Sequence, residues 1–163
     1  MRLVLTRDLS GAETRFRVYD DLGRLSYRVE GEYAETGSVQ RLLCADGREI
    51  AAVSQKKPVK SVYTVSVGGV PAIRIFRSFH YIYPCCRLFD LGWRIRGNLL
   101  HQEYEVLSLH DTVILEQKRI WSSLGESFEL IIPNPKYQVA CLGIAVAVND
   151  TTPVGPGTIL ARE

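Results

Sequence analysis

The chain has 163 residues, of which 46% are hydrophobic and 23% are charged, and its formal net charge is +2. This length suits one domain whose core needs no disulfide or metal for stability. A charge of +2 provides no general attraction to nucleic acid, so we expect no nucleic-acid partner. The cysteines occur as two single residues and one adjacent pair (Cys44, Cys85, Cys86, Cys141), without CxxC spacing. We therefore expect reduced thiols in a cytoplasmic protein, with no metal and no cofactor.

Short runs with strand-like alternation follow one another along the first 132 residues. In chain order they are 3–5, 16–19, 25–29, 39–44, 50–56, 62–67, 70–76, 81–89, 93–97, 103–107, 113–119 and 127–132. Turn residues such as Asp46-Gly47 and Gly68-Gly69 separate them, and Pro84 suggests an edge or bulged strand at 81–89. No helical period of 3.6 residues is sustained before Pro133. Roughly twelve strands of this spacing predict a closed antiparallel barrel or a sandwich.

A single helix is predicted over residues 135–149. Asn134 can cap its start, Pro135 suits the first helical position, and Pro153 prevents its continuation. Residues 139–148 are apolar on every side, and a helix with no polar face has to be buried. This stretch is too short to cross a bilayer, which takes roughly 20 residues. We therefore expect a helix enclosed by the strands, made thin by Gly143 and three alanines.

An internal repeat divides the strands into two halves. Residues 53–57 (Val-Ser-Gln-Lys-Lys) resemble residues 115–119 (Leu-Glu-Gln-Lys-Arg), and an aromatic strand follows each. The repeat predicts two related halves within one domain spanning 1–150. Residues 151–163 contain Gly155-Pro156-Gly157 and are expected to form a flexible tail. The N-terminus lacks the apolar core and cleavage site of a signal peptide.

The order of these features resembles the LURP-one-related proteins of the tubby C-terminal-like superfamily. The resembling segments are Tyr19–Gly23 with Tyr27–Gly31, Asp46-Gly47 before Val53–Lys57, Trp93–Gly97, and the apolar helix ending at Val148-Asn149-Asp150. The resemblance covers residues 1–150 and implies a twelve-stranded barrel around a hydrophobic helix. Tubby domains bind phosphoinositides through basic residues on the barrel exterior, and phospholipid scramblases are distant relatives. The lipid ligands of tubby domains have no matching positions in this chain.

Basic residues form the candidate binding site. The repeat places Lys56, Lys57 and Lys60 at one corner and Lys118 and Arg119 at another, while Arg74 and Arg77 lie in a strand between them. We expect Lys56 and Lys118 to face solvent and Lys57 and Arg119 to point the other way. Such cations can hold a phosphate group or an anionic lipid head group. The alternative is that they only protect strand edges and keep the surface soluble.

The sequence contains no recognisable catalytic motif. A G-x-S-x-G elbow and a phosphate-binding glycine loop are both missing, and Glu103 and Glu105 on one strand face are more typical of a solvated surface. We expect a non-enzymatic binding module for anionic phospholipid head groups or another phosphorylated ligand. The alternative is a protein-interaction scaffold that uses an exposed aromatic residue such as Phe79 or Trp121. A scramblase-like role is less favoured, and any membrane contact would be peripheral.

Overall fold

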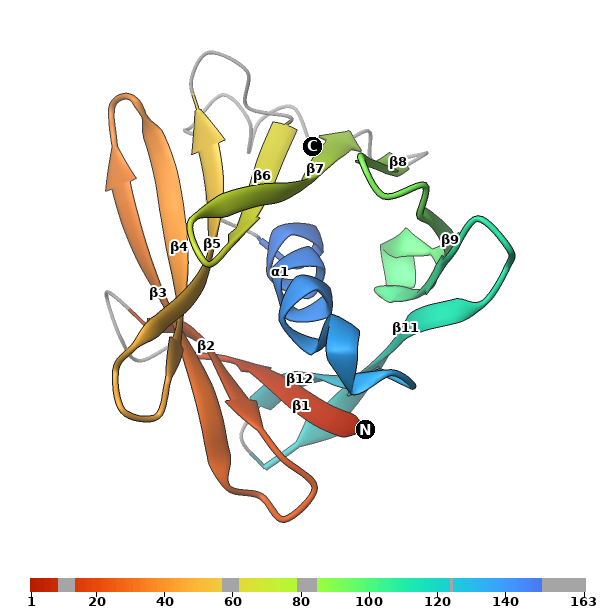
Figure 1. Ribbon diagram of the computed structural model, residues 1–163. Helices are drawn as coiled ribbons and strands as arrows, with labels where there is room; N and C mark the ends of the chain where they lie inside the picture. Colours follow the sequence, from red (N-terminus) through yellow and green to blue (C-terminus); the bar gives the residue numbers. More distant parts are fainter. Residues whose placement is uncertain (9–13, 57–61, 79–84, 124, 151–163) are drawn as a thin grey trace.

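The computed structural model describes residues 1–8, 14–56, 62–78, 85–123 and 125–150 (Figure 1). These residues form twelve strands, two short 3₁₀ helices and one α-helix. The strands are β1 (Arg2–Arg7), β2 (Thr14–Tyr19), β3 (Leu25–Ala34), β4 (Gly37–Cys44), β5 (Glu49–Lys56), β6 (Val62–Val67), β7 (Val70–Ser78), β8 (Cys85–Phe89), β9 (Arg94–Asn98), β10 (Glu103–Leu107), β11 (Val113–Ser122) and β12 (Gly125–Ile131). The helices are η1 (Leu99–His101), η2 (Pro135–Tyr137) and α1 (Gln138–Val148).

The strands form one antiparallel sheet that curls into a barrel. Their order is β8-β7-β6-β5-β4-β3-β2-β1-β12-β11-β10-β9, and the pairing of β1 with β12 joins the two halves of the chain. The prediction of a twelve-stranded antiparallel barrel is therefore confirmed. The predicted closure is not complete, because β8 and β9 stand at the two ends of this order and form no ladder with each other.

The two halves suggested by the repeat are visible in the strand order. Strands β1–β6 and β7–β12 each follow one another, and corresponding strands such as β5 and β11 stand six places apart in the sheet. Six places in a barrel of twelve strands correspond to opposite sides of the wall. Val53 on β5 and Leu115 on β11 are both buried in the core. The repeated segments therefore occupy equivalent but opposite positions around the barrel.

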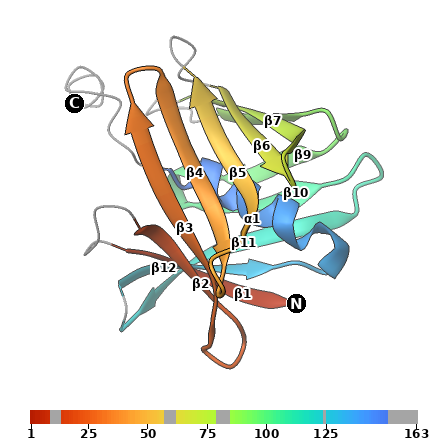
Figure 2. The same cartoon turned by 60° about the vertical axis from the view of Figure 1, so that its left-hand side comes forward.

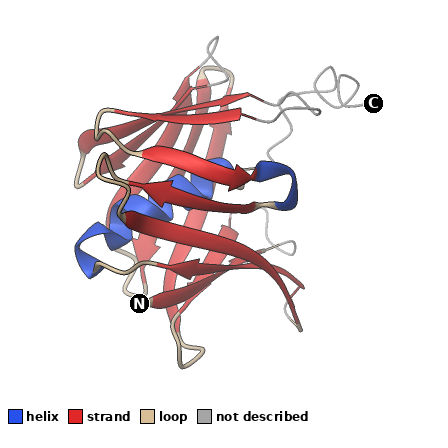
Figure 3. Cartoon of the chain, turned by 90° about the vertical axis from the view of Figure 1, so that its right-hand side faces the viewer, coloured by secondary structure: helices blue, strands red, loops and turns tan. Residues whose placement is uncertain are grey.

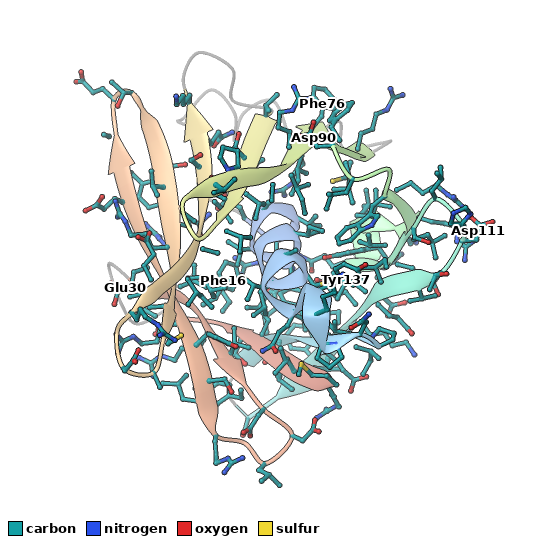
Figure 4. All side chains as sticks on the ribbon, in the orientation of Figure 1. Phe16, Glu30, Phe76, Asp90, Asp111 and Tyr137 are labelled. Atoms are coloured by element: carbon teal, nitrogen blue, oxygen red, sulfur yellow. The ribbon has the colours of Figure 1, made fainter. Side chains whose placement is uncertain are left out.

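The apolar helix lies inside the barrel, as predicted (Figures 1, 2 and 3). The Asn134 side chain accepts a hydrogen bond from the Lys136 backbone N–H at 3.0 Å, which caps η2 at the predicted start. The predicted helix 135–149 begins with this 3₁₀ turn before α1 continues. All residues from 141 to 148 are buried. Figure 4 shows Phe16 between the strands and α1, among the side chains that fill the space around the helix.

Burial should make one thiol in the helix unreactive. Cys44, Cys86 and Cys141 are free cysteines, and burial raises the pKa of the Cys141 thiol to about 12. Because the thiolate is the reactive form, we expect iodoacetamide at pH 8 to label the half-buried Cys44 much faster than Cys141 in the folded protein. Both sites should react in denaturant, which serves as the control. Mass spectrometry of the labelled peptides measures the ratio, and equal native rates would mean that the helix leaves the core.

Candidate functional site

The predicted basic residues do not form one cluster. Lys56 on β5 and Lys118 on β11 are both exposed, as predicted, but their strands lie on opposite sides of the barrel. Lys57 and Lys60 lie outside the described residues. The two corners are therefore separate surfaces, and each has to be judged from its own neighbours.

The corner on β11 is largely occupied by contacts within the chain. Lys118 Nζ lies 3.3 Å from Glu116 Oε1, which partly neutralises its charge. The guanidinium of the half-buried Arg119 lies 4.7 Å from the centre of the Trp121 ring. Cation–π stacking of this kind leaves the guanidinium little freedom to receive another group. This corner offers little unpaired positive charge.

Arg77 points into the barrel and caps the C-terminal end of α1. Its Nη1 donates hydrogen bonds to the backbone oxygens of Ala147, at 3.1 Å, and of Asp150. The last carbonyls of a helix lack partners within the helix, and a cation there also interacts favourably with the helix dipole. Arg7 makes the same kind of contact, donating to the Asn149 oxygen at 2.9 Å. Arg77 thus has a structural role at the end of the helix.

The same end of the helix carries a buried polar network. Tyr63 Oη donates to Asp150 Oδ2 at 3.0 Å, and Asp150 is only 4% exposed. Gln117 exchanges hydrogen bonds with the side chain of Asn149 at 2.8 and 3.1 Å and accepts one from Tyr104 Oη at 2.9 Å. Burial raises the pKa of Tyr63, and Asp150 reinforces this shift. Buried polar groups have to be paired, so these residues fix the helix rather than face a ligand.

Arg74, in contrast, lies on the outer face of β7 and lines an open groove across β5, β6 and β7. Lys56, at the end of β5, lines the same groove. Hydroxyl groups lie between the two cations, since the register sets Ser54 opposite Thr64 and Thr64 opposite Arg74. The polar groove residues are Ser54, Lys56, Thr64, Ser66, Arg74 and Asp90. Two of the predicted binding residues thus belong to one surface together with three hydroxyls.

The two cations of this groove differ in their electrostatic state. Lys56 is exposed and has no acidic partner among the described residues. Arg74 grips Asp90 with two hydrogen bonds, from Nε to Oδ2 and from Nη2 to Oδ1, each 2.9 Å long. The hydrogen bonds from Arg74 hold the pKa of Asp90 below its ordinary value, so the pair stays charged at neutral pH. Figure 4 shows Asp90 on the outside of the barrel.

A second shallow groove crosses β9, β10 and β11 and has a different charge. Arg96 pairs with Glu105 at 2.7 Å, and Lys118 pairs with Glu116. Glu103 adds a third carboxylate to the lining. With three carboxylates against two cations, this groove is less suited to an anion than the one on β5–β7. Glu103 and Glu105 were noted in the sequence, and the structure ties Glu105 to an arginine.

Sequence patterns alone missed parts of the groove on β5–β7. Arg74 and Arg77 were grouped, although three residues along a strand place side chains on opposite faces. The serine and threonine hydroxyls were overlooked, because alternating small polar residues are ordinary on an exposed strand face. Asp90 follows β8, and its pairing with β7 depends on the fold. The alternation in β5 and β6 was the signal that could have identified the hydroxyl row.

Two further features were searched for within the described ranges. Of the helices there, none has the length and apolar character needed to cross a membrane. Nor does any group of three His, Cys, Asp or Glu side chains in that part of the chain have a geometry that could hold a metal ion.

Comparison with known proteins links the chain to one family. Residues 1–149 match the family model described as LURP-one-related. A Bacillus subtilis (strain 168) protein, described as uncharacterized protein YxjI, is 22% identical over 150 residues, which cover 91% of this chain and 92% of that protein. The X-ray structure of an Arabidopsis thaliana protein shares the fold, with a TM-score of 0.63 and 14% identity over 90% of this chain and 89% of the other.

Proposed function

The chain belongs to the LURP-one-related family, and from this premise we propose that it is a non-enzymatic module that binds the phosphate of an anionic phospholipid head group in the groove on β5–β7. The observation that carries the proposal is the meeting of Lys56 and Arg74 with three hydroxyls on one outer face. Phosphate oxygens accept hydrogen bonds from ammonium, guanidinium and hydroxyl groups, and such charge-assisted bonds are the stronger ones.

The filled interior supports a site on the outside. Residues 141–150, from the middle of α1 to just beyond its end, are all buried among the strands. An enzyme of this size needs a concave pocket for its substrate, and the helix takes up the space that a barrel would otherwise offer. Binding at the exterior groove needs no such cavity, because a lipid head group can approach from solvent.

Liposome co-sedimentation tests the proposal through Lys56. We expect binding to vesicles that contain anionic phospholipid and little binding to neutral vesicles. A lysine near an anionic membrane contributes about 1 kcal/mol, so Lys56→Glu should weaken binding by about tenfold or more. Lys118→Glu is the matched control, because it makes the same change at an exposed position on the opposite side of the barrel. Asp90→Asn should act in the other direction, since it releases Arg74 and removes a negative charge from the groove.

Each result discriminates between readings. Equal binding to neutral and anionic vesicles, or equal effects of Lys56→Glu and Lys118→Glu, would refute the proposal. Inhibition by free inorganic phosphate at low millimolar concentration would indicate that the phosphate alone is recognised, without a membrane. The alternative function is a protein-interaction scaffold. It is favoured if vesicles do not bind and if partner capture depends on Trp121, which is 76% exposed, and does not depend on salt.

A further inference from the structure

The barrel wall has one open seam, between β8 and β9. These strands are joined by the short turn 90–93 and lie next to each other (Figure 1), yet neither has a ladder partner on the side of the seam among the described residues. Every other pair of neighbouring strands in the order is laced by backbone hydrogen bonds. Strands at an open edge present unpaired backbone N–H and C=O groups, which can pair with another extended chain.

The corresponding place in the first half of the chain is closed. There the backbone N–H of Asp20 donates to the Arg24 oxygen at 2.9 Å, and β2 pairs with β3. Both turns contain Asp-Leu-Gly, at 21–23 and 90–92, and both glycines have positive φ, at 76° and 68°. The local sequence of the turn therefore does not explain the open seam.

Contacts made beyond the turn distinguish the second half. The Asp90 carboxylate binds Arg74 on β7 instead of the backbone of its own turn. Trp93, the residue that corresponds to Arg24, is buried and packs edge-to-face on Tyr137, with ring centroids 5.1 Å apart. Burying Trp93 beside η2 holds the start of β9 toward the core, and β9 does not form a hairpin with β8.

The side chains that flank the seam form an inner apolar row and an outer basic row. Leu88 on β8 and Ile95 on β9 are partly buried and pack against the core. Arg87, Arg94 and Arg96 are exposed on the outer side. Arg94 and Arg96 pair with Asp111 and Glu105, whereas Arg87 has no acidic partner in the described part of the chain. A strand added here would place alternate side chains against these two rows.

We propose that the seam between β8 and β9 is a strand-addition site for an extended peptide of a partner protein in which apolar and acidic residues alternate. The peptide backbone bonds to the open strand edges, its apolar side chains contact Leu88 and Ile95, and its acidic side chains face Arg87 and Arg96. Main-chain hydrogen bonds provide affinity in this mode of recognition, and the alternate side chains provide specificity. Charge complementarity identifies the partner as acidic rather than basic.

Fluorescence anisotropy with three labelled ten-residue peptides tests this proposal on the full chain. The probes are an alternating Val/Glu peptide, an alternating Val/Lys peptide, and the Val/Glu peptide with alternate backbone nitrogens methylated. We expect saturable binding of the first peptide only. Arg87→Glu and Arg96→Glu should each weaken it by about tenfold, because like charges then face each other. Arg41→Glu is the matched control, since Arg41 is also paired with glutamates and lies on β4, away from the seam.

Several results would overturn the proposal. Equal binding of the Val/Glu and Val/Lys peptides, undiminished binding of the methylated peptide, or equal effects of Arg87→Glu and Arg41→Glu would each do so. If the Val/Glu peptide binds only after residues 151–163 are deleted, the seam belongs to that segment of the chain itself. If the protein forms dimers in light scattering that Arg87→Glu dissociates, the seam belongs to a second copy. Circular dichroism on each variant verifies that the barrel remains folded.

Discussion

Replacing Ala145 with aspartate is expected to prevent the protein from folding. Ala145 is 0% exposed in the middle of α1, within a core of apolar side chains. A carboxylate there would have neither water nor a cation beside it, so burying an unpaired charge should lower the free energy of unfolding by more than about 4 kcal/mol. Thermal melting followed by circular dichroism measures the effect. Because a loss of this size approaches the whole stability of a domain, insoluble expression would be an equivalent result.

Ala34→Asp provides the control for the aspartate itself. Ala34 is exposed at the end of β3, so this variant should melt within a few degrees of the parent. Gly143→Leu tests the same region by volume rather than charge. A Cβ atom at Gly143 would already lie 2.4 Å from Val65 Cγ1, and a leucine would overfill the space between α1 and β6. Unchanged melting of both helix variants would show that α1 is not in the core.

The second large effect is expected from Arg77→Met. This substitution removes the hydrogen bonds to the oxygens of Ala147 and Asp150 and takes a cation away from the buried Asp150 carboxylate. Breaking one partner of a buried charged pair typically costs about 3–5 kcal/mol, so the free energy of unfolding should fall by about that amount. Urea unfolding followed by tryptophan fluorescence measures it, with the slope of the transition verifying two-state behaviour.

Arg74→Met is the matched control, because it is the same substitution on the same strand. The Arg74–Asp90 pair lies in solvent, where a salt bridge contributes about 0–1 kcal/mol, so this variant should lose little stability. Adding Asp150→Asn to Arg77→Met should recover part of the loss, since no unpaired carboxylate then remains. Comparable losses for Arg74→Met and Arg77→Met would contradict the inner and outer placement of the two arginines.

Much of the fold could be predicted because its elements are written locally. Alternation over five to ten residues marks a strand whose two faces meet different environments, and an apolar stretch without a polar face marks a buried helix. Asn134 and Pro135 begin the helical segment as predicted, because a capping side chain acts on backbone groups two residues away. The repeat at Gln55 and Gln117 correctly indicated two halves, since equivalent strands face equivalent interiors.

The binding residues were harder to predict, because charge in a sequence does not reveal its neighbours. Lys56 and Lys118 occupy equivalent places in the repeat, yet one lines a groove of hydroxyls and the other pairs with Glu116. Arg74 pairs with Asp90, which is 16 residues away along the chain. No local rule separates a cation that is free from one that is already paired.

The sequence by itself determined a single β-rich domain of about twelve strands around one apolar helix, because periodicity and capping act over a few residues. Only the tertiary structure decided that Arg77 caps that helix, that Lys56 and Arg74 share a groove, and that the wall opens between β8 and β9. The two Asp-Leu-Gly turns show why. Their local chemistry is alike, and the burial of Trp93 against Tyr137, 44 residues further along, accompanies the opening of one and not the other.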